Sequence, residues 1–243
     1  MRAILTYHSI DDSGSAISVP PARFRCQMEW LLSEGVQVVP MDDLLRLPDS
    51  SRAAALTFDD GIGNLVTEGL PVLEDLGWSA MVFVVTGRVG TDNRWHTAGR
   101  RRVPTLPLLG WDELARLEAR NWTIGSHSRN HRRLPDCTDT QLDEELQGAA
   151  EDLESALGTR PGWFAYPYGA LDSRVAGRTA GSYASACTTD LRPLGPTEDP
   201  MRLPRIDAWY LTGPVRRMGW GSPPFRRHLR WRATLRAVRQ LAP

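Results

Sequence analysis

Two histidines stand four residues apart in the stretch HSRNH, His127 to His131, which directly follows an apolar run ending at Gly125. If this stretch turns helically, the two imidazoles lie about 5 to 6 Å apart at Cβ, which is close enough to share one cation. Histidine pairs at this spacing also occur as surface or capping residues. The pair therefore predicts a metal site only if a third ligand comes from elsewhere in the chain.

Two adjacent carboxylates offer that ligand, because Asp59 and Asp60 end the apolar stretch LTFDDG. Successive side chains on an extended backbone point to opposite sides, so one carboxylate can ligate a metal while the other faces a water beside it. Two His and one Asp around an open coordination position make Zn²⁺ a hydrolytic catalyst, since the ion lowers the pKa of bound water to roughly 7. The alternative is that both carboxylates cap a turn before Gly61.

Short apolar or β-branched runs must position these side chains, and helical patterns separate the runs. We expect seven strands, within residues 3–8, 53–60, 80–87, 121–128, 162–169, 183–190 and 202–209. This alternation is typical of parallel βαβ units. Because polar residues gather at the C-terminal ends of the runs, it predicts an α/β fold of the TIM-like (β/α) barrel type, with its site at that face. A doubly wound open sheet is the competing architecture.

Four segments show helical patterns between the strands: residues 21–35, 64–77, 111–120 and 138–158. In the first, Phe24, Met28, Leu31 and Leu32 recur at helical spacing, and the pattern stops at Gly35. The last segment is acidic. We expect it to present a solvated face with no functional role.

The composition excludes several classes of protein. All 29 basic residues are arginine and 29 acidic residues balance them, which gives no reason to expect a nucleic-acid partner. The three cysteines are far apart and fit a reducing compartment. The apolar segment Ala3 to Tyr7 is too short for the core of a signal peptide, and no stretch is long enough to span a membrane. We therefore expect a cytoplasmic protein.

Three motifs carry a family resemblance. In their order and spacing, LTFDDG, SHSRNH and FAYPYG resemble the polysaccharide deacetylases with the NodB homology domain, carbohydrate esterase family four. YHSI at the start and LPRI near the end are similar to the branch with an N-terminal Tyr-His motif, as in enzymes that act on poly-N-acetylglucosamine. The resemblance covers roughly residues 3–210. It implies a distorted (β/α) barrel with one divalent metal, commonly Zn²⁺, although Asp-His-His also suits Co²⁺ and Ni²⁺.

The resemblance also implies a role for each matching residue. It assigns the metal to three side chains: Asp60, His127 and His131. Asp59 would be the general base beside the metal-activated water. The backbone N–H of Tyr168 would stabilise the oxyanion that forms on an acetamide carbonyl, and His8 would protonate the leaving amine.

The sequence departs from the family pattern at two places. Many members carry Arg before the Pro-Tyr of the third motif, where it orients the catalytic Asp, and this chain has Ala165 there. We expect Arg205, in LPRID, to supply the missing guanidinium. A late Leu-His motif is also absent, and His8 is expected to replace its acid.

Aromatic residues are the candidates for sugar binding, because sugar sites use aromatic faces with a few hydrogen-bonding groups. They are Tyr166, Trp95, Trp209 and Tyr210, with His96 beside Trp95. Ordinary packing is the alternative for each of them.

Beyond Tyr210 the family pattern ends and the chain becomes basic. We divide the chain into a catalytic domain, residues 1–212, and a basic C-terminal segment, residues 213–243. Arginines alternate with apolar residues in this segment, which is typical of an amphipathic helix that can lie on an anionic membrane surface. Such a contact would place the protein at the cytoplasmic face of the membrane and make a lipid-linked sugar a candidate substrate. A solvated helix packed on the barrel is the alternative.

We therefore expect a metal-dependent hydrolase that removes an N-acetyl group from an amino sugar. One alternative keeps the mechanism and changes the substrate to a small or cyclic non-sugar amide. Another is a sugar-binding protein that has lost turnover. The sequence defines neither the form of the sugar nor the oligomeric state.

Overall fold

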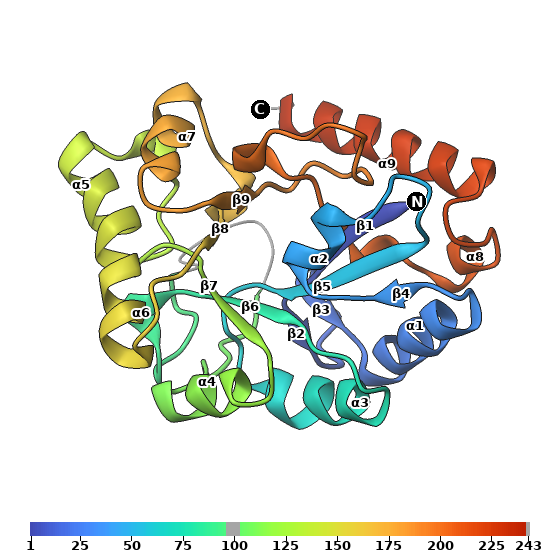
Figure 1. The fold of residues 1–243 in the computed structure, drawn as a ribbon, viewed down its shortest axis with the longest axis horizontal. Helices are drawn as coiled ribbons and strands as arrows, with labels where there is room; N and C mark the ends of the chain where they lie inside the picture. The colour runs from blue at the N-terminus through green and yellow to red at the C-terminus, as the bar shows by residue number, and fades with distance from the viewer. Residues whose placement is uncertain (96–102, 242–243) are drawn as a thin grey trace.

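The apolar runs of the sequence form a curled parallel sheet in the computed structural model, which describes residues 1–95 and 103–241 (Figure 1). Seven strands lie in the order β10-β1-β5-β6-β7-β8-β9, and the short strand β4 pairs in addition with the start of β5. The bounds of these strands are β1 Arg2–Tyr7, β4 Gln37–Val38, β5 Ala53–Phe58, β6 Met81–Val84, β7 Thr123–Ser126, β8 Trp163–Ala165, β9 Ser185–Cys187 and β10 Ile206–Asp207. The prediction of an α/β fold with a distorted barrel of seven parallel strands is confirmed.

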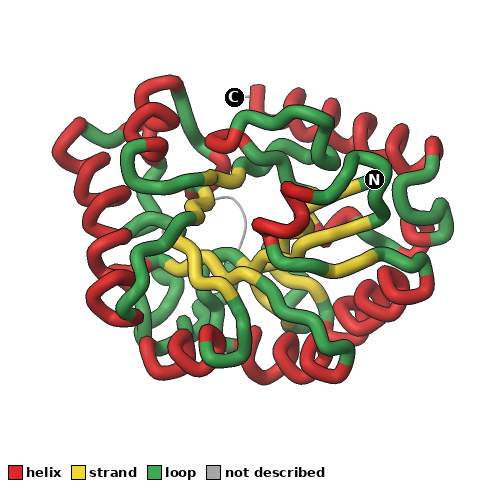
Figure 2. Tube along the Cα trace, in the orientation of Figure 1, coloured by secondary structure: helices red, strands yellow, loops and turns green. Residues whose placement is uncertain are grey.

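Most helices cover the outer side of this sheet, as Figure 2 shows in red around the yellow strands. These outer helices are α1 Pro21–Ser33, α3 Leu70–Asp75, α4 Trp111–Glu118, α5 Asp139–Asp143, α6 Ala149–Leu157, α7 Ser173–Ala180, α8 Gly213–Arg216 and α9 Pro223–Leu241. The short helix α2, Met41–Arg46, packs instead on the inner face of the sheet. Single π-helical turns precede α3 and join α5 to α6. A separate parallel pair, β2 (Ser9–Ile10) with β3 (Ser18–Val19), follows β1. In the described part of the chain, no helix has the length and apolar character needed to cross a bilayer.

Both faces of the strands are buried, which explains why they read as continuous apolar runs. Successive side chains of a strand point to opposite faces of the sheet. Those on one face, such as Leu5 and Leu56, pack in a cluster with α1 and α3. Those on the other face, such as Ala55 and Phe83, pack in a second cluster with Met41 and other residues. Leu32 differs from our expectation, because it is 57% exposed at the outer side of α1.

One short segment bridges the two edges of the sheet. Leu203 pairs with Cys187 at the end of β9, and three residues later Ile206 pairs with Leu5 of β1. Arg205 lies between these two pairings. The main chain therefore carries its side chain into the space between β9 and β1, on the side where the strands end.

Candidate active site

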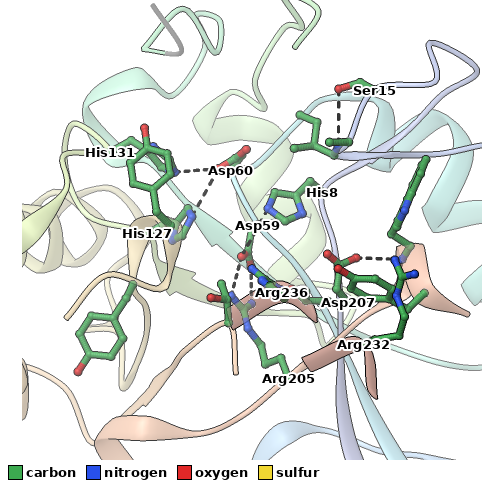
Figure 3. Close-up of a pocket in the computed structure, with 18 of the residues that line it drawn as sticks. His8, Ser15, Asp59, Asp60, His127, His131, Arg205, Asp207, Arg232 and Arg236 are labelled. Atoms are coloured by element: carbon green, nitrogen blue, oxygen red, sulfur yellow. Dashed lines mark hydrogen bonds and ion pairs between the residues drawn. The ribbon is translucent and has the colours of Figure 1, made fainter. Parts of the chain in front are cut away.

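The C-terminal ends of the strands meet at one cavity of about 860 Å³ (Figure 3). This volume is in the range of pockets that hold drug-sized ligands, about 300–1,000 Å³. The residues proposed from the sequence that line it are His8, Asp59, Asp60, His127, His131, Tyr166, Tyr168, Arg205, Trp209 and Tyr210. The strand order thus brings together side chains that are up to two hundred residues apart in the sequence.

Three buried side chains converge on one point of the cavity. Oδ1 of Asp60 lies 3.5 Å from Nε2 of His127 and 3.3 Å from Nε2 of His131. All three ligand atoms lie within 4.8 Å of one another. The chemistry of one carboxylate and two imidazoles suits a single divalent cation.

The hydrogen bond of His127 fixes which of its nitrogens faces Asp60. Nδ1 lies 2.7 Å from the carbonyl oxygen of Ala165, and a carbonyl can only accept, so Nδ1 carries the proton. Burial lowers the pKa of His127 to about 4, which keeps the ring neutral near pH 7. A lone pair on Nε2 then faces the carboxylate of Asp60, and two acceptors at that distance repel each other unless a cation lies between them. This arrangement matches metal-binding histidines, whose other nitrogen donates to a carbonyl or carboxylate.

The backbone around these ligands has an unusual conformation. Among the described residues, five non-glycine residues have a positive φ, and four of them belong to the site or its loops: Asp60, Ser128, His131 and Tyr168. Such conformations cost free energy and cluster at functional sites. The HSRNH stretch is therefore a loop, and our assumption of a helical turn is wrong. The two rings still meet, with centroids 4.9 Å apart.

The acidic segment from α5 to α6 holds this loop in place. Glu145 accepts hydrogen bonds from the backbone N and the side-chain Nδ2 of Asn130, at 2.8 and 2.9 Å, and pairs with Arg132. Asp152 accepts from Nε and Nη2 of Arg129 at 3.0 and 3.1 Å. We call these contacts the loop clamp. It fixes the residues between the two metal-ligand candidates.

The loop clamp contradicts our expectation of a solvated acidic face. Glu145 is only 1% exposed. The sequence did contain a signal, since Glu145 shares the helical face of the buried residues Leu142, Leu146 and Ala149. A carboxylate on the apolar side of a helix indicates a buried partner.

Asp59 has a different environment from its neighbour Asp60. Nη1 and Nη2 of Arg205 donate to its two oxygens at 2.6 and 2.7 Å, and both side chains are buried. Nε of Arg205 donates to the carbonyl of Thr188 at 3.0 Å. Burial alone would raise the pKa of Asp59, but the guanidinium of Arg205 lowers it below its usual value. The two adjacent acids therefore have separate partners, one cationic side chain and one pair of imidazoles.

His8 lies on the cavity side of Asp59, directly after β1. Its Nε2 is 3.9 Å from Oδ2 of Asp59, and its side chain is 26% exposed. Figure 3 shows it between Asp60 and Asp207. Its ring is more exposed than the buried side chains of Asp59 and Arg205, so solvent and a substrate can reach it.

The predicted sugar-binding aromatics occupy different positions. Tyr166 is buried and packs against Phe164, at 5.2 Å between centroids, whereas the side chain of Tyr168 is 50% exposed. Trp95 stacks near His131, with centroids 4.9 Å apart. His96 lies outside the described residues.

Trp209 and Tyr210 line the cavity and are both half-buried. Each has an arginine over its ring, Arg23 at 5.6 Å for Trp209 and Arg232 at 4.7 Å for Tyr210. Arg232, Arg236 and Asp207 also line the cavity, and our sequence-based site did not include them. The basic character of residues 213–243 was visible, but which arginines reach the cavity depends on how α9 docks.

Comparisons with known proteins agree with this geometry. The family profile described as polysaccharide deacetylase matches residues 46–183, which include Asp59, Asp60, His127 and His131. YxkH of Bacillus subtilis (strain 168), named as a polysaccharide deacetylase, is 26% identical over 171 residues, covering 68% of this chain and 56% of that protein. The chain thus spans little more than half the length of this curated relative.

Solved structures share the fold. The Streptococcus pyogenes deacetylase PplD superposes with a TM-score of 0.72 at 21% identity, over 84% of this chain and 91% of that one. IcaB from Ammonifex degensii gives 0.75 at 20%, over 89% and 94% of the two chains. BC0361, a polysaccharide deacetylase from Bacillus cereus, gives 0.71 at 24%, over 85% and 64%. With the matched profile and the buried Asp-His-His group at the strand ends, this chain belongs to the polysaccharide deacetylase family.

Proposed function

We propose that this protein is a metal-dependent N-deacetylase that hydrolyses the acetamide of an N-acetylated amino sugar. One observation carries the proposal: Asp60, His127 and His131 converge on a cation site, while Asp59 is held apart from them by Arg205. The site thus has a ligand set and a separate carboxylate base. Zn²⁺ is our choice of metal, with Co²⁺ and Ni²⁺ as alternatives.

Asp60, His127 and His131 would hold a divalent ion, which would supply the Lewis acidity that acidifies water and polarises a carbonyl. Asp59 accepts the proton of the attacking water. Its double hydrogen bond to Arg205 fixes the carboxylate plane and keeps it ionised near pH 7, so it is ready to act as the base.

The leaving amine needs a proton, and His8 is placed to deliver it. Its Nε2 lies close to Asp59, and its ring is partly open to the cavity. We assign stabilisation of the developing oxyanion to the backbone N–H of Tyr168, whose left-handed conformation (φ 61°) turns the chain at the cavity.

Features outside the matched range support the branch with the N-terminal Tyr-His motif. His8 lies beside Asp59, and Arg205 binds Asp59, as we expect of a replacement for the third-motif Arg. Of the proteins with the same fold, PplD is described as a deacetylase in complex with acetate. We take an N-acetylated glycan or glycoside as the substrate class.

Two other functions use the same residues. Hydrolysis of a non-sugar amide would need no change in mechanism, and product analysis separates it from sugar deacetylation. A sugar-binding protein without turnover would release no acetate. The buried pairing of Asp59 with Arg205 favours catalysis, because a protein that only binds sugar has no use for an oriented base.

Acetate release from a panel of N-acetylated sugars tests the proposal. The panel should contain polymeric, lipid-linked, nucleotide-linked and simple glycosides, with Asp59→Asn as the inactive control. Acetate from at least one sugar, lost in the control, is the expected result. No release from any of them, in protein loaded with Zn²⁺, Co²⁺ or Ni²⁺, would refute it.

We also propose that α9 contacts an anionic membrane surface, which would place the protein at the cytoplasmic face. Trp231 and Val238 are 55% and 59% exposed on this helix, beside exposed arginines. Phe225 and Leu229 of the same helix are buried in the core, so truncation at residue 223 would open the core. Trp231→Ser with Val238→Ser is the better variant for vesicle co-sedimentation, and equal binding by variant and wild type would contradict the contact.

A further inference from the structure

The C-terminal helix α9 presents two arginines to the wall of the active-site cavity. Arg232 and Arg236 are four residues apart, so they lie on the same side of the helix, and both are half-buried. Arg226, Arg227 and Arg230 of the same helix are exposed. Of the arginines described on this helix, Arg232 and Arg236 are therefore the two whose side chains line the cavity.

No carboxylate forms an ion pair with either of these arginines in the described part of the chain. Arg232 lies instead over the rings of Tyr210 and Trp231, at 4.7 and 5.5 Å. Two like charges at this spacing disfavour a helix unless an anion lies near them.

The acidic side chains of the cavity differ in their surroundings. Asp59 is paired with Arg205, and Asp60 faces the two imidazoles. Asp207 accepts a hydrogen bond from the backbone N of Trp209 at 2.9 Å and interacts electrostatically with Arg236 without forming a salt bridge. Two arginines thus face a single carboxylate on the α9 side of the cavity, and Figure 3 shows Arg232 across the cavity from His127 and His131.

We infer that Arg232 and Arg236 form a subsite for a phosphate or diphosphate group on the sugar substrate, an inference that rests on the proposed deacetylase function. Guanidinium groups match phosphate oxygens through paired N–H donors. The contact with Tyr210 holds the plane of Arg232 before an anion arrives. The cavity of about 860 Å³ has room for the sugar and its substituent together.

The shared chemistry is a phosphate ester on the amino sugar, and it has three sources: a free sugar phosphate, a nucleotide diphosphate sugar and a lipid-linked diphosphate sugar. The probes are N-acetylglucosamine 1-phosphate, its uridine diphosphate derivative, and its polyprenyl diphosphate derivative in detergent micelles. Methyl N-acetylglucosaminide is the neutral reference. The measured quantity is the preference, the ratio of kcat/KM for each phosphorylated sugar to kcat/KM for the reference.

Wild-type protein should prefer at least one phosphorylated sugar. Arg232→Gln and Arg236→Gln should each lower that preference about 10- to 100-fold, since each removes hydrogen bonds to a charged group. Arg230→Gln, on the exposed side of the same helix, is the matched control and should leave the preference unchanged. A preference confined to the micelle-borne sugar identifies a lipid-linked substrate, and one shared by all three identifies the phosphate itself.

A wild-type preference for the neutral sugar, or a preference equally high in both glutamine variants, would overturn the subsite. A different result, no acetate release from any of the sugars, would show that the proposed deacetylase function is wrong. Calorimetric binding of the uridine diphosphate sugar then tests the subsite alone. Weaker binding by Arg236→Gln than by Arg230→Gln supports it, and equal binding overturns it.

Discussion

Arg205 binds both carboxylate oxygens of Asp59, at 2.6 and 2.7 Å, from a position 146 residues further along the chain. The third motif has no arginine of its own, since Ala165 stands at that position and its carbonyl accepts a hydrogen bond from His127. The segment that bridges β9 and β1 delivers the guanidinium instead. Asp59 and the guanidinium that binds it therefore come from distant parts of the sequence.

Replacing Arg205 with Ala should lower kcat about 100-fold while metal content stays at the wild-type level, because the base loses its orientation. Arg205 lowers the pKa of Asp59, so its removal should raise that pKa and move the acid limb of the kcat/KM profile to higher pH. The pH profile, kcat and bound metal check both effects.

Two variants control for stability in this experiment. Breaking a buried ion pair costs about 3–5 kcal/mol, so Arg205→Lys, which keeps the charge, should unfold at a higher temperature than Arg205→Ala. Arg202→Ala removes an exposed arginine from the same segment and should behave as wild type. Unaltered turnover in Arg205→Ala would contradict the orienting role.

Glu145→Gln should weaken metal binding about 10- to 100-fold, because partners that orient metal ligands have effects of this size. The substitution removes the charge that accepts two hydrogen bonds from Asn130 and pairs with Arg132. Competition with a chelator measures the affinity. Glu144→Gln, exposed on the same segment, is the matched control. Equal metal affinity in the two variants would show that the loop clamp does not support the metal ligands.

His8→Ala should lower kcat on an acetamide about 10²- to 10⁴-fold if His8 is the general acid. The loss on 4-nitrophenyl acetate should be much smaller, because 4-nitrophenolate leaves without a proton. His228→Ala, in α9 and away from the cavity lining, is the control and should change neither rate. An equal loss on both substrates would mean that His8 acts in another way.

The strand ends were predictable for a physical reason. Parallel strands that are buried on both faces must be apolar throughout, so the polar residues that follow them are easily recognised in the sequence. Asp59, Asp60, His127 and His131 were found in this way, and the structure brings them together. The helical turn that we considered for HSRNH is absent, because Ser128 and His131 take left-handed conformations that the sequence pattern does not reveal.

Other features depend on packing between distant segments. Glu145 was expected in solvent and is buried; its place on the apolar face of the helix indicates burial, but its partners are in a loop that only the fold brings near. Arg236 reaches the cavity because Phe225 and Leu229 anchor α9 in the core, whereas Arg230 of the same helix is exposed. Composition alone cannot separate a cavity-lining arginine from an exposed one.

The two carboxylates of LTFDDG are predicted to have different tasks, and bound metal measured together with acetate release separates them. Asp60→Asn should lose both metal and activity, because it removes the charged ligand of the cation site. Asp59→Asn should keep one metal per chain and release no acetate, since Asp59 faces Arg205 and is not part of the ligand set. Metal retained in full by Asp60→Asn, or lost equally in both variants, would contradict this division of roles.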